Sequence, residues 1–186
     1  ELFYDKASKK YYIVWASTIE GKFEDAPSSE DQYNHRLYYT TTKDFKTFTP
    51  TQLFYDPGFN VIDACILKEG GKYRIFLKNE TLDPVEKNIR MVSTNSLKKI
   101  PLNVSEPISG KEWAEGPTAI KIGKYTYVYW DLYRNHRYAA VRCKNLKKGN
   151  WEKLDGMATF PAGMRHGTVF CVNEDILYKL LENENK

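Results

Sequence analysis

Apolar and polar residues alternate along most of the chain, which is the pattern of half-buried β-strands. The clearest alternating runs are Tyr11–Ala16, Leu37–Thr41, Tyr73–Leu77, Tyr125–Trp130 and Val169–Val172. Turn-forming residues separate them, as at Gly70-Gly71, Gly123 and Asp56-Pro57-Gly58. A helical pattern occurs only over Glu174–Glu182. The sequence therefore predicts an all-β chain with one short helix.

The strands recur as a repeated unit. The stretches "ELFYDKASKKYYIVWAST" from Glu1, "IDACILKEGGKYRIFLKNE" from Ile62 and "EGPTAIKIGKYTYVYWDLY" from Glu115 each give an apolar strand, a turn and an aromatic strand. A third strand follows each pair, in "RLYYTTTKDFKTF", "IRMVSTNSLKKI" and "YAAVRCKNLKKGNW". Repeated antiparallel units of about 40–50 residues are typical of β-propeller blades. A three-unit β-sandwich is the alternative, although sandwiches do not usually repeat this signature.

The repeats divide the chain into blade units at about 1–61, 62–112 and 113–163. Residues 164–186 then give the inner strand of a further blade, over Arg165–Val172, and the C-terminal helix. Three units and a single strand do not close a ring of propeller size. We therefore expect residues 1–186 to form part of a propeller domain, with further material before Glu1.

A polar residue opens each repeat: Glu1, Asp63, Glu115 and His166. Because the first strand of each propeller blade lines the central axis, these four side chains are expected to converge at one end of a channel. The small neighbours Ala64, Gly116 and Gly167 would let the backbones approach closely. For any one of them, an ordinary polar residue at a strand edge is an equal interpretation. Four in register favour a site, and clustered carboxylates acquire separated pKa values.

These residues carry a family resemblance. "ELFYD", "VIDACI", "EGPTAIKIGKYTYVYWD" and "RHGTVFCV" resemble, in this order, glycoside hydrolase family 43. That family consists of five-bladed β-propeller enzymes that include α-L-arabinofuranosidases and β-xylosidases. The resemblance implies that Glu115 is the general acid, that Asp63 orients it and keeps its pKa high, and that His166 lies in the channel near a metal ion or water. The resemblance also implies an enzyme that requires no cofactor and that can hold a calcium ion in the channel.

The family's catalytic base is an Asp in an Arg-Asp-Pro-like motif, and this sequence contains no such motif. Asp56-Pro57 and Asp83-Pro84 fall at turns between units rather than at strand starts. The resemblance implies inverting hydrolysis of arabinose-, xylose- or galactose-containing polysaccharide, with an oligo- or polysaccharide as partner. Because the base is missing, these 186 residues alone are expected to be inactive. A non-catalytic carbohydrate-binding propeller remnant is the alternative function, and a purely structural interaction propeller is a third.

Three further residues are candidates for substrate binding. Trp113, beside Glu115, is a candidate platform for sugar stacking, whereas Trp15 ends an alternating strand and is as easily a core residue. Arg165 can bind substrate hydroxyls or neutralise the carboxylates, and a plain salt bridge is an equal interpretation. Glu1 is the third candidate, at the first strand start.

Charge and composition bear on the kinds of partner that the protein can have and on the state of its cysteines. The net charge of +4 is small and looks evenly spread, so it argues against nucleic acid as a partner. No apolar run approaches the roughly 20 residues of a membrane span, so no membrane partner is expected. Cys65 and Cys171 lie in apolar strand patterns, which predicts buried free thiols. No signal peptide is visible, and only the family resemblance suggests a secreted or periplasmic protein.

Overall fold

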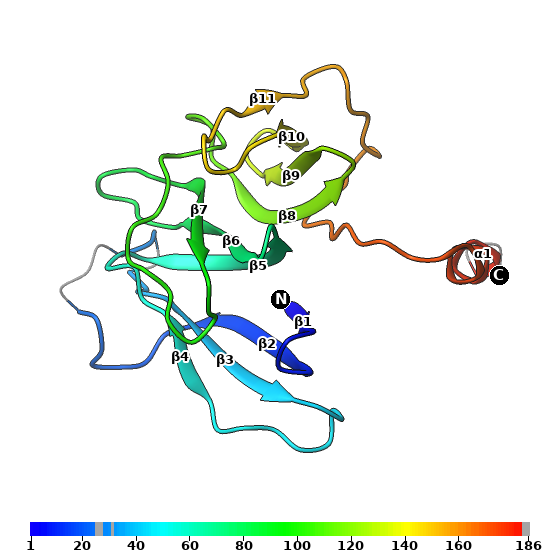
Figure 1. The fold of residues 1–186 in the computed structure, drawn as a ribbon. Helices are drawn as coiled ribbons and strands as arrows, with labels where there is room; N and C mark the ends of the chain where they lie inside the picture. Colours follow the sequence, from blue (N-terminus) through cyan, green and yellow to red (C-terminus); the bar gives the residue numbers. More distant parts are fainter. Residues whose placement is uncertain (25–27, 31, 184–186) are drawn as a thin grey trace.

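The computed structural model describes residues 1–24, 28–30 and 32–183; residues 184–186 of the predicted last segment lie outside the described residues. Three antiparallel sheets follow one another along the chain (Figure 1). The first contains β1 (Leu2–Asp5), β2 (Lys10–Ser17), β3 (Arg36–Thr42) and β4 (Gln52–Tyr55). The second contains β5 (Val61–Glu69), β6 (Lys72–Asn79) and β7 (Asn88–Thr94). The third contains β8 (Glu115–Ile122), β9 (Tyr125–Leu132), β10 (Arg137–Cys143) and β11 (Glu152–Lys153). The predicted all-β class is confirmed.

The alternation in the sequence becomes the two faces of each strand. In β9, the side chains of Thr126, Val128 and Trp130 are buried, while the intervening tyrosines are partly exposed. Successive side chains of a strand point to opposite faces, so this pattern packs one face of the strand into a core. No helix among the described residues has the length and apolar character needed to cross a membrane.

Two hydrophobic cores hold the sheets together, and the second sheet contributes to both. Val14 and Leu37 of the first sheet share a buried cluster with Ile75 of the second. Phe76, the next residue of β6, packs in another buried cluster with Val128 of the third sheet. The sheets are therefore packed in series, with the second in the middle. Their arrangement as blades around a propeller axis stays a prediction.

The starts of successive units are joined by hydrogen bonds that cross from one unit to the next. The Glu1 carboxylate accepts a hydrogen bond from Ile66 N at 3.3 Å, and the Asp63 carboxylate accepts one from Gly116 N at 3.0 Å. These bonds hold the first strands of the three sheets beside one another at the end of the molecule where the candidate residues lie.

The predicted inner strand over Arg165–Val172 is wrong, because this segment is extended but not paired in a sheet. A strand is stabilised by main-chain pairing with a neighbour, whereas the recorded bonds from this segment to the sheets involve side chains, such as those from Val169 N to Thr118 Oγ1 at 3.1 Å and from Gly167 N to the Tyr138 hydroxyl at 2.7 Å. Cys171 is exposed, so its predicted burial is also wrong, whereas Cys65 is buried as expected. The segment leads to α1 (Glu174–Asn183), which stands apart from the sheets in Figure 1.

Candidate active site

The first strands of the second and third sheets carry matching β-bulges at their starts. Asp63 and Ala64 lie opposite the single residue Leu77, and Gly116 and Pro117 lie opposite one residue of β9. Asp63 has φ of 53° and Gly116 has φ of 56°, so the first residue of each bulge has a left-handed backbone conformation. Such bulges turn a side chain away from the direction that a regular strand would give it.

This geometry corrects the alignment of the repeats. Before the bulges, Ile62 pairs with Lys78, and Glu115 pairs with Asp131. Asp63 therefore corresponds structurally to Gly116, and Glu115 corresponds to Ile62. The two carboxylates lie one position apart in the repeat, and the prediction of a shared structural position is wrong for them. Gly and Asp both tolerate left-handed φ, which is why the shift is hidden in the sequence.

The bulges nevertheless bring three of the four predicted side chains together. One ligand atom each from Asp63, Glu115 and His166 lies within 4.8 Å of the other two. His166 Nε2 lies 2.9 Å from Glu115 Oε1. A Cβ on Gly116 would lie 3.0 Å from the His166 ring, so the absence of a side chain there permits this approach.

An open hollow of about 610 Å³ adjoins this cluster. Glu1, Asp63 and His166 line it, together with Trp15 and the exposed Phe170. Glu115 is not among the lining residues, although it contacts His166. The predicted convergence of four side chains on one cavity therefore holds for three of them, while Glu115 approaches from the side.

A chain of buried charges reaches Glu115 from behind, and the sequence reasoning missed it. The Lys78 side chain is 2% exposed, and its ammonium lies 3.3 Å from Glu115 Oε2 and 2.6 Å from Glu80 Oε2. Glu80 Oε1 lies 2.5 Å from Nζ of Lys87, which is fully buried. Buried lysines are rare unless they are paired, and both are paired through Glu80. This chain holds one side of the Glu115 carboxylate.

Arg165 holds the other side of Glu115. Its Nη2 lies 3.4 Å from Glu115 Oε1, and its Nε donates a short hydrogen bond to the fully buried Asp131. The plain salt-bridge interpretation thus describes what Arg165 does in the free structure. Asp131, the β9 partner of Glu115, is a second residue that the sequence reasoning missed.

The two carboxyls of the cluster have opposite pKa shifts. Burial raises the pKa of Asp63 and outweighs the hydrogen bond from Gly116 and the charges of His166 and Lys78. Burial also acts to raise the pKa of Glu115, but the hydrogen bond with His166 and the charge of Lys78 outweigh it, so this pKa lies below its ordinary value. In the free structure the lower pKa of the two thus belongs to Glu115, whereas the sequence reasoning expected a high pKa there.

Trp113 lies behind the cluster, and its ring is covered. The Arg134 guanidinium lies 3.3 Å from the ring centroid, and the Lys87 ammonium lies 5.4 Å from it. Tyr133 contacts the same ring at 6.1 Å between centroids. A sugar could stack on Trp113 only after Arg134 moved, so the free structure does not present an open platform there.

The cluster is also the group of His, Cys, Asp and Glu side chains within the described part of the chain that could hold a metal ion. It offers two carboxylate oxygens and one imidazole nitrogen. Calcium takes six to eight oxygen ligands, so water would have to supply most of a calcium shell here. The donor set fits a divalent cation that keeps several waters.

Comparison with known proteins places these residues in context. The family model described as "Probable glycosyl hydrolase domain" matches residues 1–176. An α-L-arabinofuranosidase of Bifidobacterium longum subsp. longum is 32% identical over 88 residues, which are 43% of this chain and 8% of that protein.

Solved structures share the fold at low sequence identity. A thermostable family-43 glycoside hydrolase matches with a TM-score of 0.65 at 16% identity, over 90% of this chain and 59% of that one. The Bacteroides ovatus protein "Xyloglucan PUL GH43B" matches with a TM-score of 0.56 at 17% identity, over 82% of this chain and 27% of that one. The chain therefore spans less than two thirds of the relatives that it matches.

Proposed function

Because the chain belongs to a family of glycosyl hydrolase domains related to glycoside hydrolase family 43, we propose that the protein carrying it hydrolyses glycosidic bonds in polysaccharides. The expected substrates carry arabinose, xylose or galactose. The observation that supports this proposal most is the cluster of Asp63, Glu115 and His166 beside an open hollow. Hydrolysis of a glycosidic bond needs carboxyl groups with different protonation states, and this cluster supplies two carboxyls whose pKa values are shifted apart.

We assign Glu115 as the general acid that protonates the glycosidic oxygen. In the free structure its low pKa opposes this role, so the role requires a rise in the Glu115 pKa when substrate binds. A sugar that enters the hollow would exclude water and compete with His166 for the carboxylate, and both effects raise the pKa of a carboxyl. Asp63 accepts the hydrogen bond from Gly116 N, and through this bond it would orient Glu115, the residue before Gly116.

An inverting route needs a second carboxylate that activates water. In such enzymes the two carboxyl groups are about 6.5–9.5 Å apart, to leave room for that water. The facing oxygens of Asp63 and Glu115 lie within 4.8 Å, which is too close. We therefore assign the base to a carboxylate other than Asp63, and we expect the 186 residues alone to release no sugar.

The remaining candidates have supporting roles in this proposal. Glu1 lines the hollow and can accept hydrogen bonds from sugar hydroxyls. Arg165 can donate to substrate oxygens from beside Glu115, and Trp113 can stack on a sugar when Arg134 withdraws. A divalent ion such as calcium, held by Asp63, Glu115 and His166 with water, would neutralise the carboxylates and is not required for proton transfer.

Two substrates of different leaving-group quality test the assignment in the protein that carries this chain. Glu115→Gln should abolish most turnover of an oligosaccharide but spare an activated aryl glycoside, because an aryl leaving group needs little protonation. Asp63→Asn should slow both substrates alike. If Asp63→Asn instead shows the leaving-group dependence, then Asp63, whose pKa is the raised one, is the acid and our assignment is reversed.

A carbohydrate-binding protein without catalysis is the second candidate function. The lowered pKa of Glu115 in the free structure favours it, since a lower pKa makes this carboxyl a poorer proton donor. The two candidates differ in one measurement. Binding of an arabino- or xylo-oligosaccharide with no turnover in the longest protein that carries these residues would favour the binding function.

A further inference from the structure

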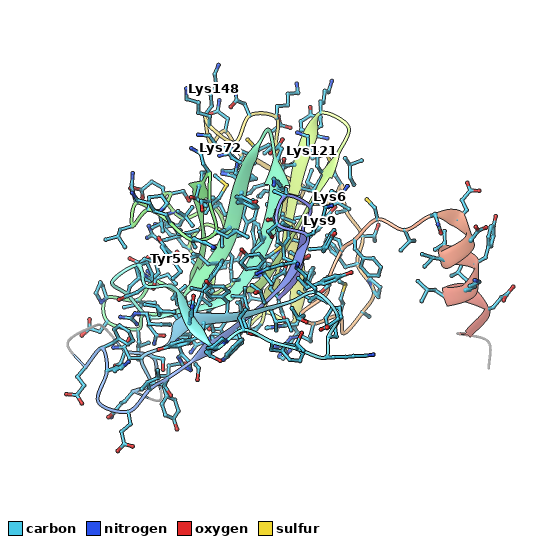
Figure 2. The ribbon with its side chains drawn as sticks, turned by 60° about the horizontal axis from the view of Figure 1, so that its bottom comes forward. Lys6, Lys9, Tyr55, Lys72, Lys121 and Lys148 are labelled. Carbon is cyan, nitrogen blue, oxygen red and sulfur yellow. The ribbon has the colours of Figure 1, made fainter. Side chains whose placement is uncertain are left out.

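Lysines gather at the end of the sheets opposite the candidate active site. We use the name lysine face for six turn segments: 5–10, 43–49, 68–72, 95–100, 121–124 and 144–150. Each is either the turn between the first two strands of a sheet or the turn after its third strand. In antiparallel sheets these turns fall at one end, and the starts of β5 and β8 fall at the other. Figure 2 shows Lys6, Lys9, Lys72, Lys121 and Lys148 from all three sheets on this side.

The lysine face carries a large surplus of positive charge. Its six segments contain fourteen lysines, no arginine, and the three acidic residues Asp5, Asp44 and Glu69, which is a surplus of eleven charges. The whole chain carries +4, so the residues outside the face carry −7. The even spread of charge expected from the sequence is therefore wrong, and the net positive charge is concentrated on the lysine face.

The three acidic residues do little to neutralise this face. Asp5 is buried and lies 3.2 Å from Lys68, and Glu69 lies 2.5 Å from Lys121. Asp44 accepts hydrogen bonds from the backbone of its own turn. Within the described part of the chain, the other twelve lysines form no ion pair that the structure records. Their charges are therefore available to a ligand.

The face is also a fixed surface. The Asp5–Lys68 pair joins the turns of the first and second sheets, and the Glu69–Lys121 pair joins those of the second and third. Leu97 and Leu146 are buried and anchor the turns that follow β7 and β10. A surface with its backbone already fixed loses less entropy when it binds a polymer.

From this arrangement we propose that the lysine face binds an acidic polysaccharide, a polymer that bears uronic-acid carboxylates. The face would hold the protein on such a polymer, while the candidate active site, about 25 Å away along an eight-residue strand, stays open to neutral chains. The choice of a polysaccharide rests on the proposed function, whereas binding of a polyanion does not.

The chemistry of the face favours carboxylates over nucleic acid. Arginine, whose planar fork binds phosphate with two hydrogen bonds, is absent from all six segments. Several aromatic rings near the face already have partners: Arg142 and Lys144 lie over Tyr125 at 4.3 and 5.3 Å, and Tyr11 contacts the rings of Tyr4 and Phe45, whereas Phe48 is exposed. Few rings are left on which bases could stack.

A binding assay with the 186-residue chain tests the proposal without any hydrolysis. The probes are polygalacturonate, a neutral galactan and duplex DNA, each measured by affinity electrophoresis at low salt. The chain should be retarded by polygalacturonate and not by galactan. Retardation should disappear at about 0.5 M NaCl, because exposed charges are screened within a few ångströms there.

Two triple variants with the same change of net charge locate the site. Lys6→Glu, Lys72→Glu and Lys148→Glu together should weaken binding of polygalacturonate by about tenfold or more. The control combines Lys22→Glu, Lys111→Glu and Lys179→Glu, which lie outside the lysine face, and should change it by less than about twofold. Equal losses in both triples would overturn the proposal, as would tighter binding of DNA than of polygalacturonate. Loss of hydrolysis in the Glu115 variants would leave all of these results unchanged.

Discussion

The buried charge chain behind Glu115 makes the strongest prediction, and Lys78→Met tests it. Methionine keeps an unbranched side chain of similar length but removes the ammonium that lies between Glu80 and Glu115. Removing one partner of a buried pair costs about 3–5 kcal/mol. Glu80 keeps its contact with Lys87, so we expect the lower limit, about 3 kcal/mol of unfolding free energy. With a urea m-value of about 2 kcal/mol/M, the midpoint should fall by about 1.5 M.

The same variant should raise the pKa of Glu115, because it removes a neighbouring positive charge. Carbon-13 NMR of the side-chain carboxyls, titrated from neutral to acid pH, measures this directly. Lys121→Met is the matched control: its ion pair with Glu69 is as short, but its side chain is 33% exposed and its loss should cost no more than about 1 kcal/mol. If the two variants are equally stable, or if the pKa of Glu115 stays where it is, Lys78 does not hold that carboxylate.

Three further predictions concern the residues around the cluster. The raised pKa of Asp63 means that the folded state binds its proton more tightly than the unfolded chain, so stability falls as pH rises above 3.8; Asp63→Asn should flatten this dependence in thermal melts. Gly116→Ala should lose more stability than Gly123→Ala, since both have φ near 55° but only the former meets an imidazole ring; equal melting temperatures would contradict this. Arg134→Ala should uncover Trp113, and acrylamide should then quench tryptophan fluorescence more strongly; unchanged quenching would show that the ring stays covered.

The sequence predicts the strands well because their alternation is a local property. Tyr125–Trp130 lies within β9, and the predicted helix over Glu174–Glu182 lies within α1. The run Val169–Val172 has the same alternation without a sheet, because pairing depends on a neighbour that periodicity does not report. Local pattern therefore identifies strands but not their partners.

The sequence predicts which residues form the candidate site better than it predicts their positions in the strands. Asp63, Glu115 and His166 do converge, yet the alignment of Asp63 with Glu115 is off by one residue because two bulges are invisible in the sequence. The role of Lys78 was missed because a lysine in a strand is ordinarily expected to be exposed. Its burial depends on Glu80, two positions further along the chain, and "KNE" gives a weak signal of that pairing.

The position of the second sheet between two hydrophobic cores has a consequence for how the molecule comes apart. The first or third sheet can separate by giving up one core, but the second cannot open without losing both. Amide hydrogens of β6 should therefore exchange with deuterium most slowly, and exchange of the outer sheets should be independent of each other. Proteins organised in this way can gain or lose a sheet at either end without rebuilding the middle.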